Sequence, residues 1–265
     1  MNKARRDIRL LLVEDNATNQ EVALRILQHL GYEKVELADD GKQALARLAS
    51  ADFDLVLMDC HLPEMDGYET SRQIRKRDSA VRNPDIPIVA TTAAAMDSDR
   101  RKCIAAGMNG YVSKPLRIDA LERAIAEWTG GIGAAVEPSV APSAAAAPQT
   151  TLFDSQEFSD RVMGNEGLAR RIIRGFVNDM PRQLALLAQA VSSGDVPQVR
   201  LTAHSIKGAA ASVSGPEIRE AAWILEQQGR DGNLTGAAAG LRELSASFDR
   251  ARPVMEIFCQ AATDE

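Results

Sequence analysis

The first half of the chain alternates short apolar runs with amphipathic stretches, and this alternation constrains the fold more than any other feature. Five strands that alternate with five helices predict an α/β domain in which a parallel sheet is covered on both faces, a doubly wound arrangement. Ligand chemistry in such a fold gathers at the carboxyl ends of the strands. The strand patterns lie at 8–13, 34–38, 54–58, 87–91 and 110–113, and the helical patterns at 17–30, 41–49, 66–77, 97–106 and 118–128.

A composition change separates this half from the rest of the chain. Residues 131–150 contain three prolines and one charged residue, Glu137, so this stretch cannot form a core face and its prolines interrupt any helix. A flexible chain of this length spans roughly 25 Å. We therefore expect an α/β domain at 1–130, a linker at 131–150 and a second domain at 151–265.

The second domain shows helical patterns and no convincing strand. The breaks fall at Gly194, at Gly215 and at the sequence RDGNLTG, and Pro181 is expected to bend the second helix. This half is predicted to be an all-α helical bundle. The expected helices are 154–163, 166–192, 196–213, 216–229 and 237–262.

Charge and composition exclude several functions. The net charge is −6 and neither half carries a basic excess, so nucleic acid is not an expected partner. The chain contains no stretch typical of a signal peptide or a membrane span. Three cysteines without metal-ligand spacing suggest a reducing compartment. We therefore expect a cytoplasmic location and no membrane segment in this chain.

Carboxylates follow two of the predicted strands. Glu14 and Asp15 come directly after the first strand and Asp59 after the third, so all three converge at one edge of the sheet. Crowded carboxylates repel one another unless a cation lies among them, and oxygen ligands suit Mg²⁺. The competing interpretation, that the acids cap the following helices, would explain one or two of these positions.

The last two strands end in groups that suit a phosphoryl ligand. Thr92 ends the fourth strand and Lys114 the fifth. A hydroxyl and an ammonium group are poor partners for a metal but good partners for phosphoryl oxygens held on Asp59. Thr91 and Thr92 point to opposite faces of a strand, so only one of them can reach the site.

These motifs resemble the receiver domain of two-component response regulators. The resemblance covers residues 7–128 and rests on LLVEDN, DLVLMDCHLPEMDG, PIVATTAAA and GYVSKPL. It implies a five-stranded flavodoxin-like fold in which Asp59 accepts a phosphoryl group. It also implies that Glu14, Asp15, Asp59 and the backbone carbonyl of His61 bind Mg²⁺.

The same resemblance assigns roles at the later strands. Thr92 would hydrogen-bond the phosphoryl group, Lys114 would pair with it, and the Lys114–Pro115 peptide bond would be cis. Tyr111 would be an aromatic switch, although ordinary packing remains an alternative. The His61 side chain is expected to be part of a loop rather than a ligand, and Cys60 an isolated, small apolar thiol.

One histidine in the second half is predicted to face solvent. On a helical wheel with 100° per residue, His204 lies about 160° from Ile206, which marks the apolar face. Gly208 and Ala211 lie on the same side as His204 and leave room for another protein surface. A neutral imidazole is a good nucleophile near neutral pH, and Lys207 one turn along can stabilise a phosphoryl charge on it.

This segment resembles the histidine phosphotransfer (HPt) domain over about 152–262. The motif is an alanine–histidine pair followed by an aliphatic residue, lysine and glycine, and the resemblance implies that His204 carries a phosphoryl group. One departure is Ser214, where the family often has glycine, which puts the end of this helix in doubt. The motif residues are Ala203, His204, Ile206, Lys207 and Gly208.

Together the two resemblances predict a phosphorelay module. A sensor kinase histidine would phosphorylate Asp59, and His204 would pass the group to or from a receiver aspartate, in this chain or in a downstream regulator. The chain lacks an ATP lid, so we expect no ATP use by itself, as in the C-terminal part of a hybrid sensor kinase. A stand-alone regulator whose two sites serve different partners, or an interaction module that never carries phosphate, remain alternatives. A haloacid-dehalogenase-like hydrolase would need an aspartate at position 61, which is histidine.

Overall fold

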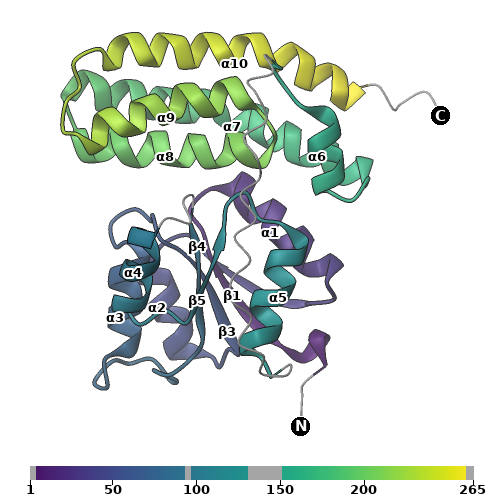
Figure 1. Ribbon diagram of the computed structural model, residues 1–265, viewed down its shortest axis with the longest axis vertical. Coiled ribbons are helices and arrows are strands. Elements are labelled where there is room, and N and C mark those ends of the chain that lie inside the picture. Colours follow the sequence, from purple (N-terminus) through teal and green to yellow (C-terminus); the bar gives the residue numbers. More distant parts are fainter. Residues whose placement is uncertain (1–3, 93–96, 131–150, 261–265) are drawn as a thin grey trace.

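The computed structural model describes residues 4–92, 97–130 and 151–260. An α/β domain lies below a helical bundle, and the bundle sits over the carboxyl ends of the strands (Figure 1). The predicted linker, residues 131–150, lies outside the described residues. The elements of the α/β domain are β1 (Arg9–Val13), α1 (Ala17–His29), β2 (Lys34–Ala38), α2 (Gly41–Ser50), β3 (Leu55–Asp59), α3 (Gly67–Arg75), β4 (Ile88–Thr92), α4 (Asp97–Ala105), β5 (Gly110–Ser113) and α5 (Ile118–Trp128), with a 3-10 turn at Arg5–Asp7 before β1.

All five strands pair in parallel, in the order β2-β1-β3-β4-β5. Alternate residues of the central strands face two separate cores. Leu10, Leu12 and Leu57 pack with α1 and α5, whereas Leu11 and Met58 pack on the opposite face with α2 and α3. Helices therefore cover both faces of the sheet, which confirms the predicted doubly wound arrangement. The same coverage explains why the central strands are apolar at successive positions.

Three helices of this domain begin at side chains that cap their free N–H groups. Asn16 accepts hydrogen bonds from Thr18 and Asn19 at the start of α1. Asp40 and Asp66 cap α2 and α3 in the same way. The cap at Asn16 fixes the first turn of α1 directly beyond the carboxylates that follow β1.

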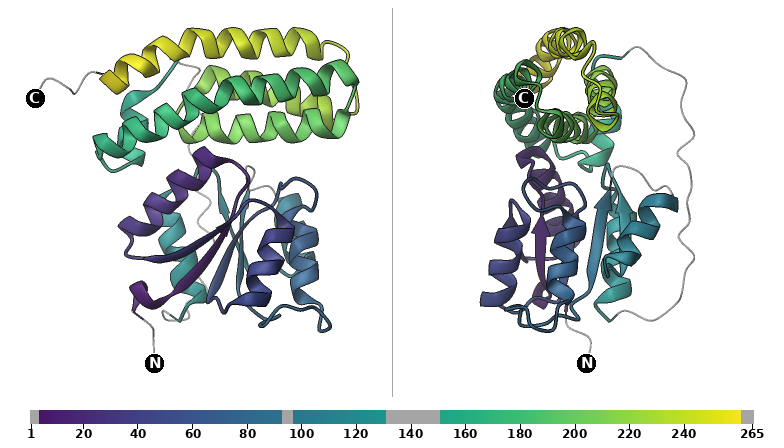
Figure 2. Two further views of the ribbon diagram at one scale, coloured as in Figure 1. Left: turned by 180° about the vertical axis from the view of Figure 1, so that it is seen from behind. Right: turned by 90° about the vertical axis from the view of Figure 1, so that its left-hand side faces the viewer.

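The second half is a helical bundle, as the sequence predicts. Helices α7, α8, α9 and α10 form four adjacent rods, each packed on the next and α10 back on α7 (Figure 2). Helix α7 continues through Pro181 without interruption and ends at Gly194, whose φ of 69° is left-handed. The elements are α6 (Ser155–Arg161), α7 (Glu166–Ser193), α8 (Val196–Ser212), α9 (Pro216–Arg230) and α10 (Ala237–Gln260).

The departure at Ser214 does not disturb the end of α8. The helix ends at Ser212, and Ser214 takes the left-handed conformation, with φ of 54°, that a glycine would favour. The Gly215 N–H then donates to the Ala210 carbonyl, which is a C-terminal turn of the Schellman type. The serine is tolerated here because the surrounding packing fixes the turn; its side chain is buried.

Among the residues that the structure describes, no helix is both long and apolar enough to cross a membrane.

Candidate functional site

Three carboxylates meet at the carboxyl end of the sheet. Glu14 and Asp15 follow β1 and Asp59 ends β3, and their ligand oxygens all lie within 4.8 Å of one another. Glu14 and Asp59 are only 3% and 2% exposed. The sequence prediction that these acids converge is confirmed, because adjacent parallel strands bring their ends to one edge.

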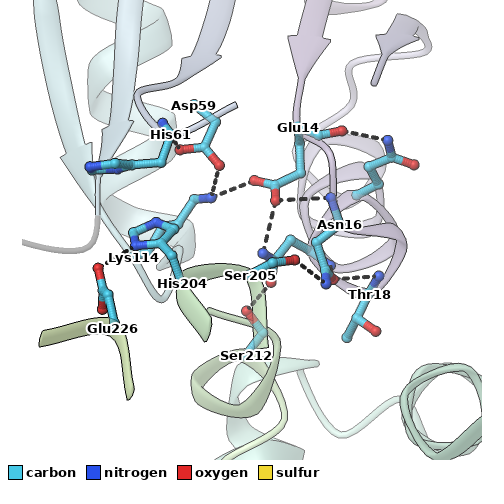
Figure 3. Close-up of polar contacts among 12 residues, drawn as sticks. Glu14, Asn16, Thr18, Asp59, His61, Lys114, His204, Ser205, Ser212 and Glu226 are labelled. Carbon is cyan, nitrogen blue, oxygen red and sulfur yellow. Dashed lines mark hydrogen bonds and ion pairs between the residues drawn. The ribbon is translucent and has the colours of Figure 1, made fainter. Parts of the chain in front are cut away.

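Lys114 enters this cluster from the end of β5 (Figure 3). Its Nζ donates to Glu14 Oε2 at 2.5 Å and to Asp59 Oδ2 at 2.7 Å. The peptide bond between Lys114 and Pro115 is cis, as expected. The backbone N–H of Lys114 donates to the carbonyl of Thr92, and this bond links the ends of β4 and β5.

The carboxyl groups differ in their affinity for protons. Burial, with repulsion from neighbouring carboxylates, raises the pKa of Glu14 to about 7 and that of Asp15 to about 8. Burial also opposes ionisation of Asp59, but the Lys114 ammonium and further partners outweigh it and hold the pKa of Asp59 below its usual value. Asp59 is therefore an ionised carboxylate, the form that attacks phosphorus.

The remaining residues singled out in the sequence lie at the end of β4, on β5 and directly after β3. Thr91 and Thr92 are both buried at the end of β4, and the Thr91 hydroxyl has no hydrogen-bond partner. Tyr111 on β5 is partly buried against the α2–α3 core. Cys60, expected to be an isolated thiol, instead lies 4.0 Å from Cys103, sulfur to sulfur.

The expectation that His204 faces solvent is wrong. Its wheel position is right, since Ile206 is fully buried in the bundle, but the imidazole is only 7% exposed. The α/β domain covers it: the His61 and His204 ring centroids are 4.1 Å apart. The ring is therefore buried between two domains, and one sequence segment could not reveal that contact.

Glu226 on α9 is a site residue that sequence reasoning missed. Its Oε1 lies 2.7 Å from His204 Nδ1, and its Oε2 accepts a 2.5 Å hydrogen bond from Lys207 Nζ. Burial opposes its ionisation, yet the bonds to His204 and Lys207 lower the pKa of Glu226 to about 2. The available signal was a glutamate within the apolar stripe of α9, four residues after Ala222 and next to Leu225.

Lys207, expected to stabilise a phosphoryl charge on His204, is bonded to Glu226 in this structure. Its ammonium group is paired with the same carboxylate that holds the imidazole. When Nδ1–H donates to Glu226, the neutral ring is in the tautomer whose other nitrogen, Nε2, has a free lone pair. The bundle thus presents one oriented, nucleophilic nitrogen.

The two domains place this imidazole beside the carboxylate cluster. A ring nitrogen of His204, a ring nitrogen of His61 and a carboxylate oxygen of Asp59 all lie within 4.8 Å of one another. The backbone N–H of His61 donates to Asp59 Oδ1 at 3.0 Å. Burial and the neighbouring His204 lower the pKa of His61 to about 3, so its ring is neutral.

Contacts between α1 and the bundle hold the domains together. Asn16 Nδ2 donates to Ser205 Oγ at 3.1 Å, and the Arg171 guanidinium on α7 pairs with Glu21 at 3.0 Å. Gly208 provides the close approach: a Cβ there would lie 3.2 Å from Asn19 Nδ2. Ala211, the other small residue predicted for docking, is partly exposed.

A chain of hydrogen bonds links this contact to the carboxylates. Ser212 Oγ donates to Asn19 Oδ1 at 2.8 Å, and Asn19 Nδ2 donates to Glu14 Oε1 at 2.9 Å. Glu14 in turn accepts from Lys114, which also binds Asp59. Docking and the charge arrangement around Asp59 are therefore physically connected (Figure 3).

Family comparisons agree with both halves of the chain. Residues 10–126 match the response regulator receiver domain, and residues 171–253 match the Hpt domain. The chain is a receiver domain followed by an Hpt domain. This combination is a phosphorelay module.

Two curated sensor proteins are similar to this chain over most of its length. The chain is 37% identical to sensor histidine kinase AruS from Pseudomonas aeruginosa over 206 residues, which is 78% of this chain and 19% of AruS. It is 30% identical to virulence sensor protein BvgS from Bordetella pertussis over 261 residues, 94% of this chain and 21% of BvgS. The chain therefore spans about a fifth of the length of these curated relatives.

Among solved structures, the receiver domain of the sensor histidine kinase PA1611 from Pseudomonas aeruginosa is 42% identical. The match covers 46% of this chain and 97% of that one, with a TM-score of 0.42. That crystal structure contains a magnesium ion coordinated in the active site cleft.

The residues of this chain fit such an ion. Glu14, Asp15 and Asp59 offer oxygen atoms at close range. Burial and mutual repulsion raise the pKa of Glu14 and Asp15, and a cation among the three carboxyls would offset both effects. Lys114 compensates only part of the negative charge. A divalent cation with oxygen preference suits this set.

Proposed function

We propose that this module passes a phosphoryl group between Asp59 and His204 of the same chain. A sensor kinase histidine would load Asp59, and His204 would deliver the group to the receiver domain of a downstream regulator. One observation carries the proposal: a ring nitrogen of His204 and a carboxylate oxygen of Asp59 approach within 4.8 Å across the domain contact. One phosphorus atom can bridge such a gap during an in-line transfer.

Loading begins with the Asp59 carboxylate. An Asp59 oxygen attacks the phosphorus of an incoming phosphohistidine, the P–N bond breaks, and the leaving imidazole takes the electron pair and then a proton. Lys114 already donates to Asp59 and can shift its hydrogen bonds to the phosphoryl oxygens. Thr92 at the end of β4 would donate its hydroxyl to the same group.

Mg²⁺ would be held by Glu14, Asp15, Asp59 and the carbonyl of His61, and it would neutralise charge on the phosphoryl oxygens. The protein supplies the geometry. The Asn19–Glu14 hydrogen bond orients one carboxylate, and the His61 N–H orients Asp59.

Transfer to the Hpt domain uses the second nitrogen of His204. Nε2 attacks the phosphorus, the bond to the Asp59 oxygen breaks, and the carboxylate is regenerated. Positive charge that develops on the imidazole is stabilised by Glu226, which accepts the Nδ1 proton in a 2.7 Å hydrogen bond. Lys207 holds Glu226 in place, so its effect reaches the histidine through that carboxylate.

The chain organisation supports exchange within one molecule. We place the receiver domain at 1–130, the linker at 131–150 and the Hpt domain at 151–265. A linker of that length gives an effective concentration of order millimolar, enough to favour docking of a weak, polar contact. Tyr111 is proposed to rotate on phosphorylation, and Ala211 to leave room for a docking receiver. We propose that the module works in the cytoplasm as part of a hybrid sensor kinase.

A phosphotransfer assay tests the proposal. The purified chain is labelled at Asp59 from a phosphorylated kinase or acetyl phosphate in Mg²⁺, and the acid-stable aspartyl and alkali-stable histidyl labels are followed with time. The wild type should move label to His204 with first-order kinetics independent of protein concentration. His204→Gln should hold label on Asp59, and Asp59→Asn should take up none. Concentration-dependent transfer would show exchange between chains instead.

A further inference from the structure

The chain has three histidines, and two of them meet at the phosphoacceptor. His61 comes from the loop after β3 and His204 from α8, and with Asp59 they place three ligand atoms within 4.8 Å of one another. We propose that Asp59, His61 and His204 form a transition-metal site across the domain contact, which binds Zn²⁺ and stops phosphotransfer. This inference rests on the docked arrangement used in the proposed function.

His204 is oriented as metal-binding histidines usually are. A ligating imidazole almost always donates its other ring N–H to a carboxylate, which fixes the ring and raises its basicity. Glu226 is the carboxylate partner of His204: its Oε1 lies 2.7 Å from Nδ1 of the ring. Lys207 fixes the position of Glu226 through a hydrogen bond to Oε2. Nε2 is left as a ligand.

His61 supplies the second imidazole. Its Nδ1 is buried and has no hydrogen-bond partner, which is costly for a polar atom unless a ligand or water satisfies it. The backbone N–H of His61 donates to Asp59, and the His61 ring lies against the ring of His204 (Figure 3). A small rotation of its side chain would turn a nitrogen toward a shared ion.

The ligand types select the metal. Two imidazole nitrogens and one carboxylate oxygen suit Zn²⁺, with water in a fourth position, and are poor ligands for Mg²⁺. Mg²⁺ would use the oxygen atoms of Glu14, Asp15 and Asp59 instead. The two sites share the Asp59 carboxylate, for which zinc and magnesium would compete. His61 would serve both sites with different atoms, its backbone carbonyl for Mg²⁺ and its ring for Zn²⁺.

Zinc at this site would occupy both atoms that carry the phosphoryl group. The His204 nitrogen would be bound and Asp59 would be neutralised, so neither could act as a nucleophile. The ion would also bridge the two domains, because His61 belongs to one and His204 to the other. Zinc is therefore expected to favour the docked arrangement while it inhibits transfer.

The experiment uses the full chain after chelator treatment, in buffer with millimolar Mg²⁺ to occupy the oxygen site. Zn²⁺ binding is followed by calorimetry, and Co²⁺ is added as a spectroscopic probe whose visible absorption bands report nitrogen ligands and low coordination number. Wild type should bind one equivalent. His61→Ala and His204→Gln should each weaken binding at least tenfold. His29→Ala is the matched control, since His29 is exposed on α1 away from the site, and it should bind like wild type.

Phosphotransfer is measured in the same samples with and without Zn²⁺, each variant relative to its own zinc-free rate. Zinc should inhibit wild type and His29→Ala, and inhibit His61→Ala only at tenfold higher concentration. Wild-type-like zinc affinity in His61→Ala overturns the metal site. Zinc binding and the zinc-free transfer rate are separate measurements, so the two proposals can fail independently. A protein that transfers normally but binds no zinc would refute only the metal site. A protein that binds zinc but shows no transfer when zinc is absent would refute only the proposed function.

Discussion

Substitution of Gly208 should affect the stability of the helical bundle and its docking on the receiver domain in different ways. In Gly208→Ala, the added Cβ would lie 3.2 Å from Asn19 Nδ2, so Asn19 must move by a few tenths of an ångström. Asn19 cannot move freely, since it is 6% exposed and hydrogen-bonded to both Glu14 and Ser212. Weakening the Ser212 bond would cost about 1 kcal/mol of docking free energy.

The effects on folding and transfer have opposite signs. Replacing glycine by alanine within α8 should stabilise the helix by up to about 1 kcal/mol, so the thermal midpoint should rise. The loss of docking free energy should nevertheless slow Asp59-to-His204 transfer roughly fivefold, because 1.4 kcal/mol corresponds to a factor of ten. Gly208→Leu extends further toward Asn19 and should reduce transfer to the rate seen between separate chains.

Single-turnover transfer and thermal melts measure the two effects in the same protein. Gly175→Ala on α7 is a matched control, because a Cβ there meets nothing within 4 Å. It should raise the thermal midpoint without changing transfer. If Gly208→Leu transfers at the wild-type rate, the docked contact through α1 is not the one used for transfer.

Three further results are expected. Glu226→Gln keeps a hydrogen-bonding group beside His204 but removes the negative charge, so transfer to His204 should slow about tenfold while labelling of Asp59 is unchanged; equal rates would exclude an electrostatic role. Arg171→Glu places a like charge against Glu21 and should slow transfer severalfold at low salt, with the difference from wild type vanishing as salt rises; a deficit that persists at high salt would point to misfolding instead. In the metal-free folded protein, the pKa is about 7 for Glu14 and about 8 for Asp15, whereas both are near their ordinary values in the unfolded chain. The stability that these protonated carboxyls contribute is therefore full below about pH 4 and is lost as the pH rises through 7 to 8. Mg²⁺ displaces those protons, so its affinity should rise from pH 6 to pH 8, and a flat affinity in a calorimetric titration would contradict these pKa shifts.

The fold could be predicted because its signals are local. The short, mainly apolar run at 54–58 is typical of a strand that is buried on both faces. It predicted β3 to within one residue of the observed Leu55–Asp59. The carboxylates Glu14, Asp15 and Asp59 could be placed together for a related reason. Parallel strands end at one edge of a sheet, so residues that follow two strands must meet there.

The contact between the domains could not be predicted from these patterns. A helical wheel places His204 opposite Ile206 correctly, yet it contains nothing about a surface that covers the ring from residues about 140 positions away in the chain. The same limit explains why Glu226 was missed. Its charge is satisfied by partners on another helix, and neither partner is marked by spacing along α9.

The sequence by itself determined which side chains can carry a phosphoryl group and on which elements they lie, because strand alternation, helix periodicity and the chemistry of carboxylate and imidazole are local properties. Only the tertiary structure decided that Asp59, His61 and His204 converge and that Asn19 connects α8 to Glu14. The physical reason is that burial of a polar group depends on what packs against it. That partner comes from a different domain, which local sequence patterns do not specify.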